Sequence, residues 1–504
     1  MVDYNQTKEG EMAYKDLRDF LLAAEDYGEL REIKGVDWSL DMGSIAELVY
    51  HEGKDPKPAL LFDEIPGYPK GFRCLFGQIS SPRRIAMALS LPAGDDQIDR
   101  KTILRNIREK LKVTSLMPPK FVKSPPVDAN VLTGDAIDIL KFPSPKFHEL
   151  DGGRYIGTAC AVINRDPDTG YVNIGTYRVM VVDRNRITLH IIEGKHGSLL
   201  MHEKYFGRGK VMPVAVAMGV DPALWFTSAR KIPWQTGEYE YAGRIKGEPM
   251  EVFEGPYTGL PLPATAEIVI EGECHPGELI EEGPFGEGCG YYANFGLEPV
   301  PEPVIRVKAI HHRDDPILTC SCPTVPPAEA SPMFAYSYSA MLWEVLEAVG
   351  LPGIKDVWCP EVGHGSMLNV VSIEQKYAGH STEVGAFASQ VRSGVGKYTI
   401  VVDDDIDPSD LNQVLWAVET RTDPVRSIQV IERCHTSTRD PAVSMEEKRK
   451  YKVAPKPLYA SKCFIDACQP FEWKPKDWYP VARSSPEQRA KVFKKYGSVL
   501  KELL

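Results

Sequence analysis

IGTACAVINRD (156–166) and YVNIGTYRVMVVD (171–183) are two of five short segments rich in Val, Ile and Thr. The other three segments are MPVAVAMG (212–219), ATAEIVIEGE (264–273) and PVIRVKAIHHR (303–313). Gly, Pro or Asp separates the segments, and this composition is typical of strands joined by turns. We therefore expect residues 155–310 to form a strand-rich domain of the barrel type.

The patterns change on both sides of this region. Residues 14–27 carry apolar residues at helical spacing, and Gly28 is expected to end that helix. The proline-dense stretch from Met117 to Pro145 is interpreted as a linker or a wrapping segment. Towards the C-terminus, the apolar run KYTIVVDDDID (397–407) precedes the helix-like SDLNQVLWAVETR (409–421), which is typical of an α/β domain.

Length and composition narrow the class of protein. A chain of 504 residues favours two or three domains, and its net charge of −11 argues against nucleic acid as the main partner. Ten cysteines are scattered without a CxxC pair, so we expect reduced thiols and no structural zinc. No apolar run approaches the roughly 20 residues of a membrane helix. We expect a soluble, cytoplasmic protein without a transmembrane segment.

The C-terminus has its own helix pattern. Ser485 is the expected N-cap, followed by Pro486 at the first helical position and Gln488. An apolar stripe follows, made of Val492, Tyr496, Val499, Leu500 and Leu503. The stripe fits either an ordinary packed terminal helix or an arm that packs on a neighbouring subunit.

The densest group of reactive side chains is EGPFGE (282–287), where Glu282 and Glu287 flank a turn of Gly and Pro. Such a turn lets the backbone approach a ligand closely. Two carboxylates held together also push one pKa upward, so that one acid can carry a proton near neutrality. The alternative is a pair of solvated turn glutamates, but the nearby Phe285, Tyr291 and Tyr292 favour a dry pocket.

The strand NIGTYR (173–178) contributes a second group. Strand alternation places Asn173 on one face and Arg178 on the other. An arginine within such an apolar strand needs a carboxylate or phosphate partner. A structural salt bridge inside a barrel would also satisfy it. Asn173, His196 and Glu238 together would suit a manganese- or magnesium-type site, although their spacing alone does not establish one.

In this order, the motifs resemble those of the UbiD-like family of prenylated-FMN-dependent decarboxylases. The resemblance covers nearly the whole chain and rests on DLRDFL with GELREI near the start, SPKFHELDGGRYIGT (144–158), NIGTYR, EGPFGE and YTIVVDDDIDPSDLNQVLWAVETR (398–421). It implies an α+β multidomain fold. The expected parts are an N-terminal α/β domain (1–125), a central split β-barrel that binds the flavin (126–320), a C-terminal α/β domain (321–470) and a tail whose helix joins subunits (471–504).

The resemblance also implies a reaction. Family members carry out reversible, non-oxidative decarboxylation of an aromatic, heteroaromatic or α,β-unsaturated acid through a covalent adduct with prenylated FMN. Arg178 would hold the substrate carboxylate, Glu287 would orient Arg178, and Glu282 would be the proton donor. The substrate wall is expected in residues 320–329 and beyond residue 380. The alternatives are a polyprenyl-hydroxybenzoate decarboxylase of quinone synthesis, a non-decarboxylating FMN-binding redox protein, or a non-catalytic assembly component.

Ligand residues follow from the same resemblance. The implied cofactor-binding residues are Asn173, Ile174, Gly175, Thr176, Arg178, Lys195, His196, Ser228, Ala229, Arg230 and Glu238. A divalent ion, Mn²⁺ or Mg²⁺, would be bound by Asn173, His196 and Glu238. A K⁺ ion would lie near Thr227, Ser228, Arg230 and Arg421. Arg230 departs from one branch of the family, where this position is uncharged, so it either contacts the flavin phosphate or marks an altered monovalent site. The implied partners are a flavin prenyltransferase, which supplies the cofactor, and further copies of the chain in a homodimer or homohexamer.

Overall fold

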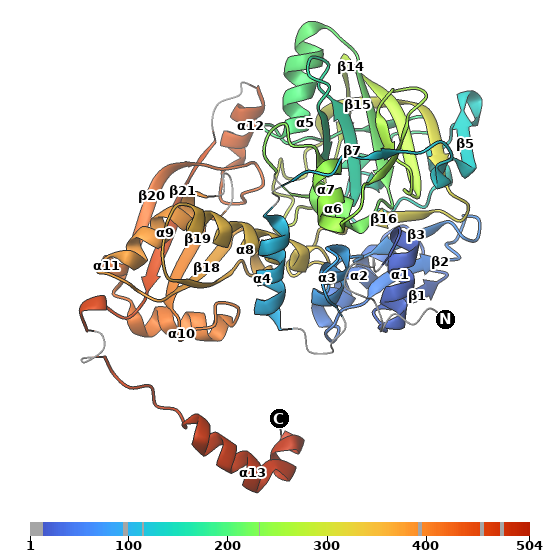
Figure 1. Cartoon of the computed structure of the whole chain (residues 1–504). Helices are drawn as coiled ribbons and strands as arrows, with labels where there is room; N and C mark the ends of the chain where they lie inside the picture. The colour runs from blue at the N-terminus through green and yellow to red at the C-terminus, as the bar shows by residue number, and fades with distance from the viewer. Residues whose placement is uncertain are drawn as a thin grey trace.

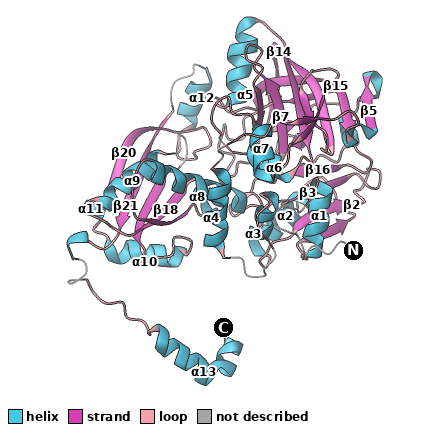
Figure 2. Ribbon diagram, viewed as in Figure 1, coloured by secondary structure: helices cyan, strands magenta, loops and turns pink. Residues whose placement is uncertain are grey.

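The computed structural model describes residues 14–93, 99–112, 115–230, 232–391, 396–453, 458–473 and 478–503. The chain forms three packed regions and an extended C-terminal helix, with strands and helices in each region (Figures 1 and 2). The fold is therefore a mixed α/β multidomain architecture.

The N-terminal region is a small sheet with the order β1-β2-β3-β16. Its strands are β1 (Leu30–Lys34), β2 (Ala59–Asp63), β3 (Arg73–Phe76) and β16 (Ile317–Cys320). Its helices are α1 (Leu17–Asp26), α2 (Asp41–Glu52), α3 (Pro82–Ala88) and α4 (Arg100–Leu111). The side chain of Asp16 accepts from two free amides at the start of α1, and Leu17, Phe20 and Leu21 are buried. The predicted helix within residues 14–27 is confirmed.

The central region is dominated by a seven-stranded antiparallel sheet with the order β10-β15-β14-β11-β7-β8, and β5 pairs with β15. Its strands are β5 (Asn130–Thr133), β7 (Cys160–Arg165), β8 (Val172–Gly175), β10 (Arg186–Thr188), β11 (Met212–Met218), β14 (Ile268–Glu282) and β15 (Val300–His312). All five sequence segments predicted as strands contribute to it. Both faces are covered, because alternate residues such as Val216 and Ala217 enter two different apolar clusters.

Smaller elements surround this sheet. Two short sheets are formed by β4 (Lys120–Phe121) with β12 (Glu251–Glu254) and β13 (Pro261–Pro263), and by β6 (Tyr155–Gly157) with β9 (Val179–Met180). The helices are α5 (His196–Leu199), a π-helical turn (Leu200–Tyr205), α6 (Pro222–Ser228) and α7 (Glu238–Lys246).

The proline-dense stretch wraps around the central region. Its β4 pairs with β12 in parallel, and its β5 adds to the large sheet along β15. Of the two interpretations offered by the sequence, the structure therefore supports the wrapping segment. β16, at residues 317–320, falls within the predicted central domain yet pairs with β3 in the N-terminal sheet. The chain thus returns to its first region before it enters the last one.

The C-terminal region is a sheet with the order β17-β18-β19-β21-β20, parallel at its centre and antiparallel at both edges. The strands are β17 (Ile354–Trp358), β18 (Leu368–Ile373), β19 (Tyr398–Asp403), β20 (Ile428–His435) and β21 (Tyr459–Ala467). The helices are α8 (Ser331–Ala348), α9 (His380–Gln390), α10 (Leu411–Arg421), α11 (Pro424–Ser427) and α12 (Met445–Val453). The strand and helix predicted between residues 397 and 421 are β19 and α10.

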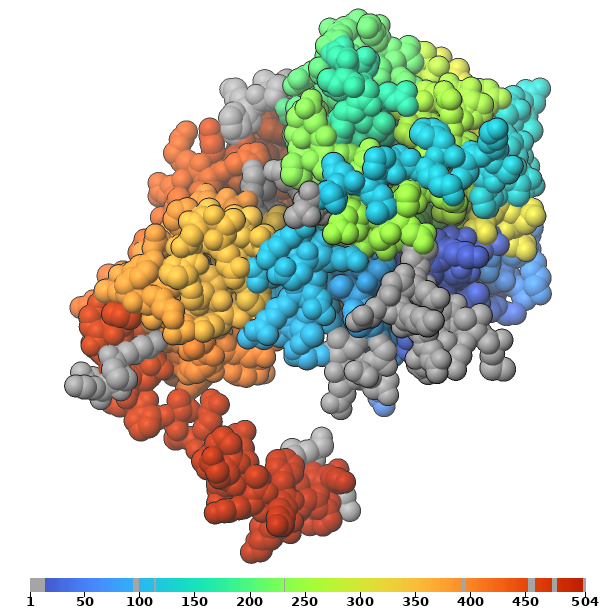
Figure 3. Space-filling view, viewed as in Figure 1, coloured from blue at the N-terminus to red at the C-terminus, as the bar shows by residue number. Residues whose placement is uncertain are grey.

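The last helix, α13 (Pro486–Leu503), projects away from the three regions (Figures 1 and 3). The Gln488 amide donates to the Ser485 hydroxyl at 3.1 Å, so the predicted N-cap is confirmed. The side chains of Phe493, Tyr496 and Val499 are about half exposed. Within the described part of the chain, no helix combines the length and apolarity needed to cross a membrane.

Candidate active site

A cavity of about 220 Å³ lies where the central and C-terminal regions meet. The central region and the loop after β16 supply one side, with Thr158, Thr176, Arg178, His190, Lys195, Trp225, Ala229, Phe285, Glu287, Ser321, Cys322 and Pro323. The C-terminal region supplies the other, with Phe334, Tyr338, His364 and Arg439. The substrate wall predicted in residues 320–329 does line this cavity. Beyond residue 380, Arg439 is the described residue that reaches it.

Arg178 is held by both predicted glutamates. Its Nε and Nη2 donate to the two carboxylate oxygens of Glu282 at 2.8 and 2.6 Å, and Nη1 donates to Glu287 at 3.1 Å. The guanidinium also lies 4.7 Å from the centre of the Phe285 ring. Burial alone would lower the pKa of Arg178, but the charges of Glu282 and Glu287 outweigh it, and the pKa is raised. Sequence reasoning therefore identified the arginine and both of its partners.

The turn after β14 brings these groups together. Glu282 ends β14, and Gly283 follows with φ +87°, a conformation that only glycine adopts without strain. A Cβ atom on Gly152 would lie 1.8 Å from the Gly283 carbonyl oxygen, so the two backbones touch. Tyr155 packs on Phe285 with ring centres 4.2 Å apart. The turn is therefore closely packed against the Gly152 backbone and beside aromatic rings, while its predicted approach to a ligand stays a prediction.

Glu287 is connected to the C-terminal region through one side chain. The Asn294 amide donates to Glu287, and the Thr438 hydroxyl donates to the Asn294 carbonyl oxygen at 2.7 Å. The neighbouring Arg439 carbonyl accepts from the Cys289 thiol at 3.5 Å. The loop after β20 therefore contacts the loop that carries Glu287 at two points.

The residues predicted to bind a divalent ion surround β8. Asn173 is buried on this strand, and α5 and α7, which begin at His196 and Glu238, both pack against it. The Ile174 amide donates to Glu238 at 2.9 Å. Burial raises the pKa of Glu238 to about 8, and the nearby charge of Glu240 acts in the same direction. A buried carboxylate in this situation fits a site that takes a cation.

Basic and hydroxyl groups lie beside this cluster. The Thr176 amide donates to the Ser228 carbonyl at 3.1 Å, and the two hydroxyls are 3.0 Å apart. Lys195 and Ala229 line the cavity. Arg230 lies over the rings of Phe226 and Tyr241, and its buried Nη1 has no hydrogen-bond partner among the described residues. Such a nitrogen is suited to an anionic ligand.

Arg421 is not part of this group, which corrects the prediction. It ends α10 in the C-terminal region, well apart from α6 in Figure 1. Its guanidinium donates to Asp403 at 3.1 Å and to Asp405 at 2.8 and 2.7 Å. Two carboxylates already satisfy this buried cation, so its role is structural. Thr227 is buried at the end of α6, where its hydroxyl donates to the Ala223 carbonyl at 2.8 Å.

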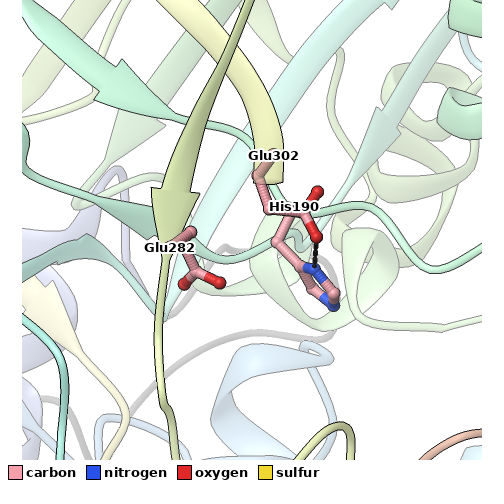
Figure 4. A group of neighbouring side chains, drawn as sticks. All are labelled: His190, Glu282 and Glu302. Carbon is pink, nitrogen blue, oxygen red and sulfur yellow. Dashed lines mark hydrogen bonds and ion pairs between the residues drawn. The ribbon is translucent and has the colours of Figure 1, made fainter. Parts of the chain in front are cut away.

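The structure adds polar residues that the sequence did not reveal. His190 lies opposite Arg178, and its Nδ1 is 2.9 Å from a carboxylate oxygen of Glu302 (Figure 4). In the far wall, burial together with the charge of Arg439 lowers the pKa of His364 to about 4. These residues are isolated in the sequence, without any pattern that would have marked them.

Comparisons with known proteins agree with this geometry. Three UbiD family models match: the 3-octaprenyl-4-hydroxybenzoate carboxy-lyase N-terminal domain at residues 21–111, the Rift-related domain at 120–326 and the C-terminal domain at 331–467. The pyrrole-2-carboxylic acid decarboxylase of Pseudomonas aeruginosa is 33% identical over 427 residues, which cover 81% of this chain and 84% of that protein.

Solved structures match over nearly the full length. The vanillic acid decarboxylase of Sedimentibacter hydroxybenzoicus, in its open form, gives a TM-score of 0.80 at 28% identity, over 97% of this chain and 99% of that one. The UbiD-class enzyme HmfF from Pelotomaculum thermopropionicum, in complex with FMN, gives a TM-score of 0.81 at 26% identity. The match covers 96% of this chain and 100% of that one. An evolved dimeric form of HmfF, in complex with prFMN, gives a TM-score of 0.77 at 27% identity. The match covers 94% of this chain and 97% of that one. The chain therefore belongs to the UbiD family of carboxy-lyases.

Proposed function

We propose that this protein reversibly removes carbon dioxide from a small aromatic or heteroaromatic carboxylic acid, with prenylated FMN as its cofactor. The observation that carries the proposal is the Arg178 guanidinium, which faces the cavity between Glu282 and Glu287. Relatives named for pyrrole-2-carboxylic and vanillic acids support the substrate class.

Each of the three residues has a distinct role in this proposal. Arg178 binds the substrate carboxylate, because its planar fork matches two carboxylate oxygens. To do so it has to release Glu282, which occupies the same fork in the structure. Glu287 keeps Arg178 oriented through Nη1. Glu282, once released and protonated, donates its proton to the carbon that has lost the carboxylate.

The residues around β8 would hold the cofactor. Asn173, His196 and Glu238 would bind Mn²⁺ or Mg²⁺. The Nη1 of Arg230 has no hydrogen-bond partner among the described residues, which supports a direct contact with the flavin phosphate. Thr176, Lys195, Ser228 and Ala229, with the backbone of Ile174 and Gly175, form the rest of the cradle, and K⁺ would lie beside Thr227 and Ser228. When bound, the cofactor supplies an electron sink for the carbanion left by decarboxylation.

The assembly is part of the same proposal. The central strands close around the cofactor as a split barrel, and α13 joins this chain to another copy in a homodimer or homohexamer. The half-exposed Phe493, Tyr496 and Val499 support the helix contact, because a helix that projects from its own fold buries such side chains by packing on another subunit. A flavin prenyltransferase supplies the cofactor.

The test is an assay of protein co-expressed with a flavin prenyltransferase. Native mass spectrometry is expected to show prenylated FMN with manganese, and the protein is expected to release CO₂ from acids such as pyrrole-2-carboxylate or vanillate. Arg178→Lys is expected to keep the cofactor and lose about 100-fold or more in kcat/KM, because it loses the two-pronged contact. Arg186→Lys is the matched control, since Arg186 pairs with the half-exposed Asp183. Bound plain FMN with no turnover and no exchange of the ring hydrogen across the panel would contradict the proposal and favour the redox alternative.

A further inference from the structure

His190 and Glu302 form a hydrogen-bonded pair directly beside Glu282. The His190 amide donates to the Arg178 carbonyl at 3.0 Å, which fixes the histidine opposite the arginine. One nitrogen of His190 and one carboxylate oxygen each of Glu282 and Glu302 lie within 4.8 Å of one another (Figure 4). The three side chains come from separate segments, and all are at least four-fifths buried.

Glu282 is engaged as an acceptor in this structure. Arg178 donates to both of its carboxylate oxygens, at 2.8 and 2.6 Å. A guanidinium can only donate, so both oxygens of Glu282 act as acceptors in this arrangement. A proton therefore has to reach Glu282 when the substrate carboxylate takes its place on Arg178. The same need recurs after each turnover, because the product carries the proton away.

Two neighbouring groups carry a proton that Glu282 could receive. The Tyr155 hydroxyl donates to the Pro284 carbonyl at 3.2 Å, but burial and the charge of Glu282 strongly raise the pKa of Tyr155, so it keeps its proton. The second group is His190, an imidazole whose two ring nitrogens can each accept or donate a proton. Its Nδ1–H can donate to Glu302, and this contact orients the ring and leaves Nε2 to exchange a proton. Its buried Nε2 has no hydrogen-bond partner among the described residues.

A small second cavity connects the two groups. It has a volume of about 10 Å³ and is lined by His190, Glu282 and Asn294, and it extends to the exposed Glu298. This volume is about the minimum that one water requires. Two hydrogen bonds of roughly 2.8 Å through one water span about 4.6 Å, and the ring nitrogen and carboxylate oxygen lie no more than 4.8 Å apart. The cavity is therefore suited to one bridging water with access towards solvent.

We propose that His190, oriented by Glu302, relays protons from solvent to Glu282. The inference rests on the proposed function. In each turnover the C–C bond to the carboxylate breaks and CO₂ leaves. The carbon takes the proton of Glu282, and a C–H bond forms. The Glu282 carboxylate then takes a proton through the water from the His190 imidazolium, and neutral His190 takes one from solvent. One solvent proton is consumed for each CO₂ released, and Glu302 keeps its charge throughout.

The test compares His190→Gln and Glu302→Gln with wild-type protein loaded with cofactor. His190→Gln is expected to lower kcat by about 100-fold with KM within about twofold, as for loss of a general acid. Glu302→Gln is expected to lower kcat by about 10-fold. In each variant, exchange of the product ring hydrogen in D₂O is expected to slow by the same factor as the kcat of that variant. The cofactor mass and spectrum are expected to stay unchanged. Added imidazole is expected to restore part of the activity of His190→Gly. His202→Gln, on the exposed π-helical turn, is the control and is expected to match wild type.

The outcomes separate the relay from the proposed function. An unchanged kcat in His190→Gln would refute the relay. If KM also rises, His190 contacts the substrate instead of relaying protons. A wild-type protein that neither releases CO₂ nor exchanges the ring hydrogen would count against the proposed function instead. The relay is then still decided by ¹⁵N spectra of histidine-labelled protein without substrate. Glu282→Gln is expected to shift the pH titration of the His190 signal, and an unchanged titration would show that the two groups are not coupled.

Discussion

Glu329 provides a stability test whose size follows from the structure. Its carboxyl is almost completely buried, accepts from the Cys322 amide at 2.5 Å and lies in the loop that lines the cavity. Burial raises the pKa of Glu329 from 4.5 to about 7, although hydrogen bonds from Ser321 and Cys322 and the nearby charge of His148 act in the opposite direction. The folded protein therefore binds this proton more tightly than the unfolded chain does.

The sign of the pH effect follows from this difference. The contribution of Glu329 to stability is fully present below pH 4.5 and is lost as the pH rises through 7. Between pH 5 and pH 8, a shift of this size removes about 2.5 kcal/mol, which corresponds to a factor of about 70 in the opening equilibrium. Glu329→Gln keeps the shape and remains neutral at every pH. The variant does not lose this stability as the pH rises. We therefore expect the opening equilibrium constant of wild type, relative to that of the variant, to rise about 70-fold between pH 5 and pH 8.

Hydrogen exchange read by mass spectrometry measures this gain locally, which suits a multidomain chain that need not unfold in one step. For peptides that span residues 317–330, the ratio of protection factors, variant over wild type, is expected to rise about 70-fold from pH 5 to pH 8. Comparison at equal pH removes the intrinsic pH dependence of exchange. Glu419→Gln, at an exposed position of α10, is expected to show a constant ratio. A constant or falling ratio in Glu329→Gln would refute the argument.

Two further predictions concern ligands. Mn²⁺ added to metal-free protein at 100 times its Kd is expected to stabilise wild type by about 2.7 kcal/mol, measured by thermal unfolding. Glu238→Gln is expected to lose most of this stabilisation. An equal stabilisation of both proteins would show that Glu238 does not bind the metal. Arg439 lines the cavity, and its buried Nε has no partner among the described residues. Arg439→Leu is expected to raise KM about 10-fold for acids with a second polar group, such as vanillate, because one charged hydrogen bond is worth about 1.5–3 kcal/mol. The KM for pyrrole-2-carboxylate is expected to change little. Equal effects on both acids would contradict a contact between Arg439 and the second polar group.

Much of this architecture could be predicted from the sequence because local patterns specify it. The five Val- and Ile-rich segments became strands of one sheet, and the apolar run before residue 403 became β19. Arg178 was identified for a physical reason, since an arginine in an apolar strand requires an anionic partner, and Glu282 and Glu287 supply it. The turn expected from Gly and Pro is present, with Gly283 at φ +87° and in contact with Gly152.

The remaining features depend on contacts between distant segments. β16 joins the N-terminal sheet through pairing with β3, more than 200 residues earlier, and no local pattern encodes such a partner. His190, Glu302 and Thr438 are single polar residues whose importance comes only from what the fold places beside them. Arg421 was misplaced for the same reason. Its position in the sequence did not reveal that Asp403 and Asp405 already bind it.

The contact from Thr438 through Asn294 to Glu287 has a consequence for how such proteins can be recombined. Thr438 of the C-terminal region helps to orient Arg178 of the central region, through Asn294 and Glu287. The two regions are therefore not interchangeable modules. A chimera that takes its C-terminal region from a relative would need to inherit the loop after β20 and the loop after β14 from the same parent. In this chain, substitutions on either side of the contact are therefore expected to affect one another.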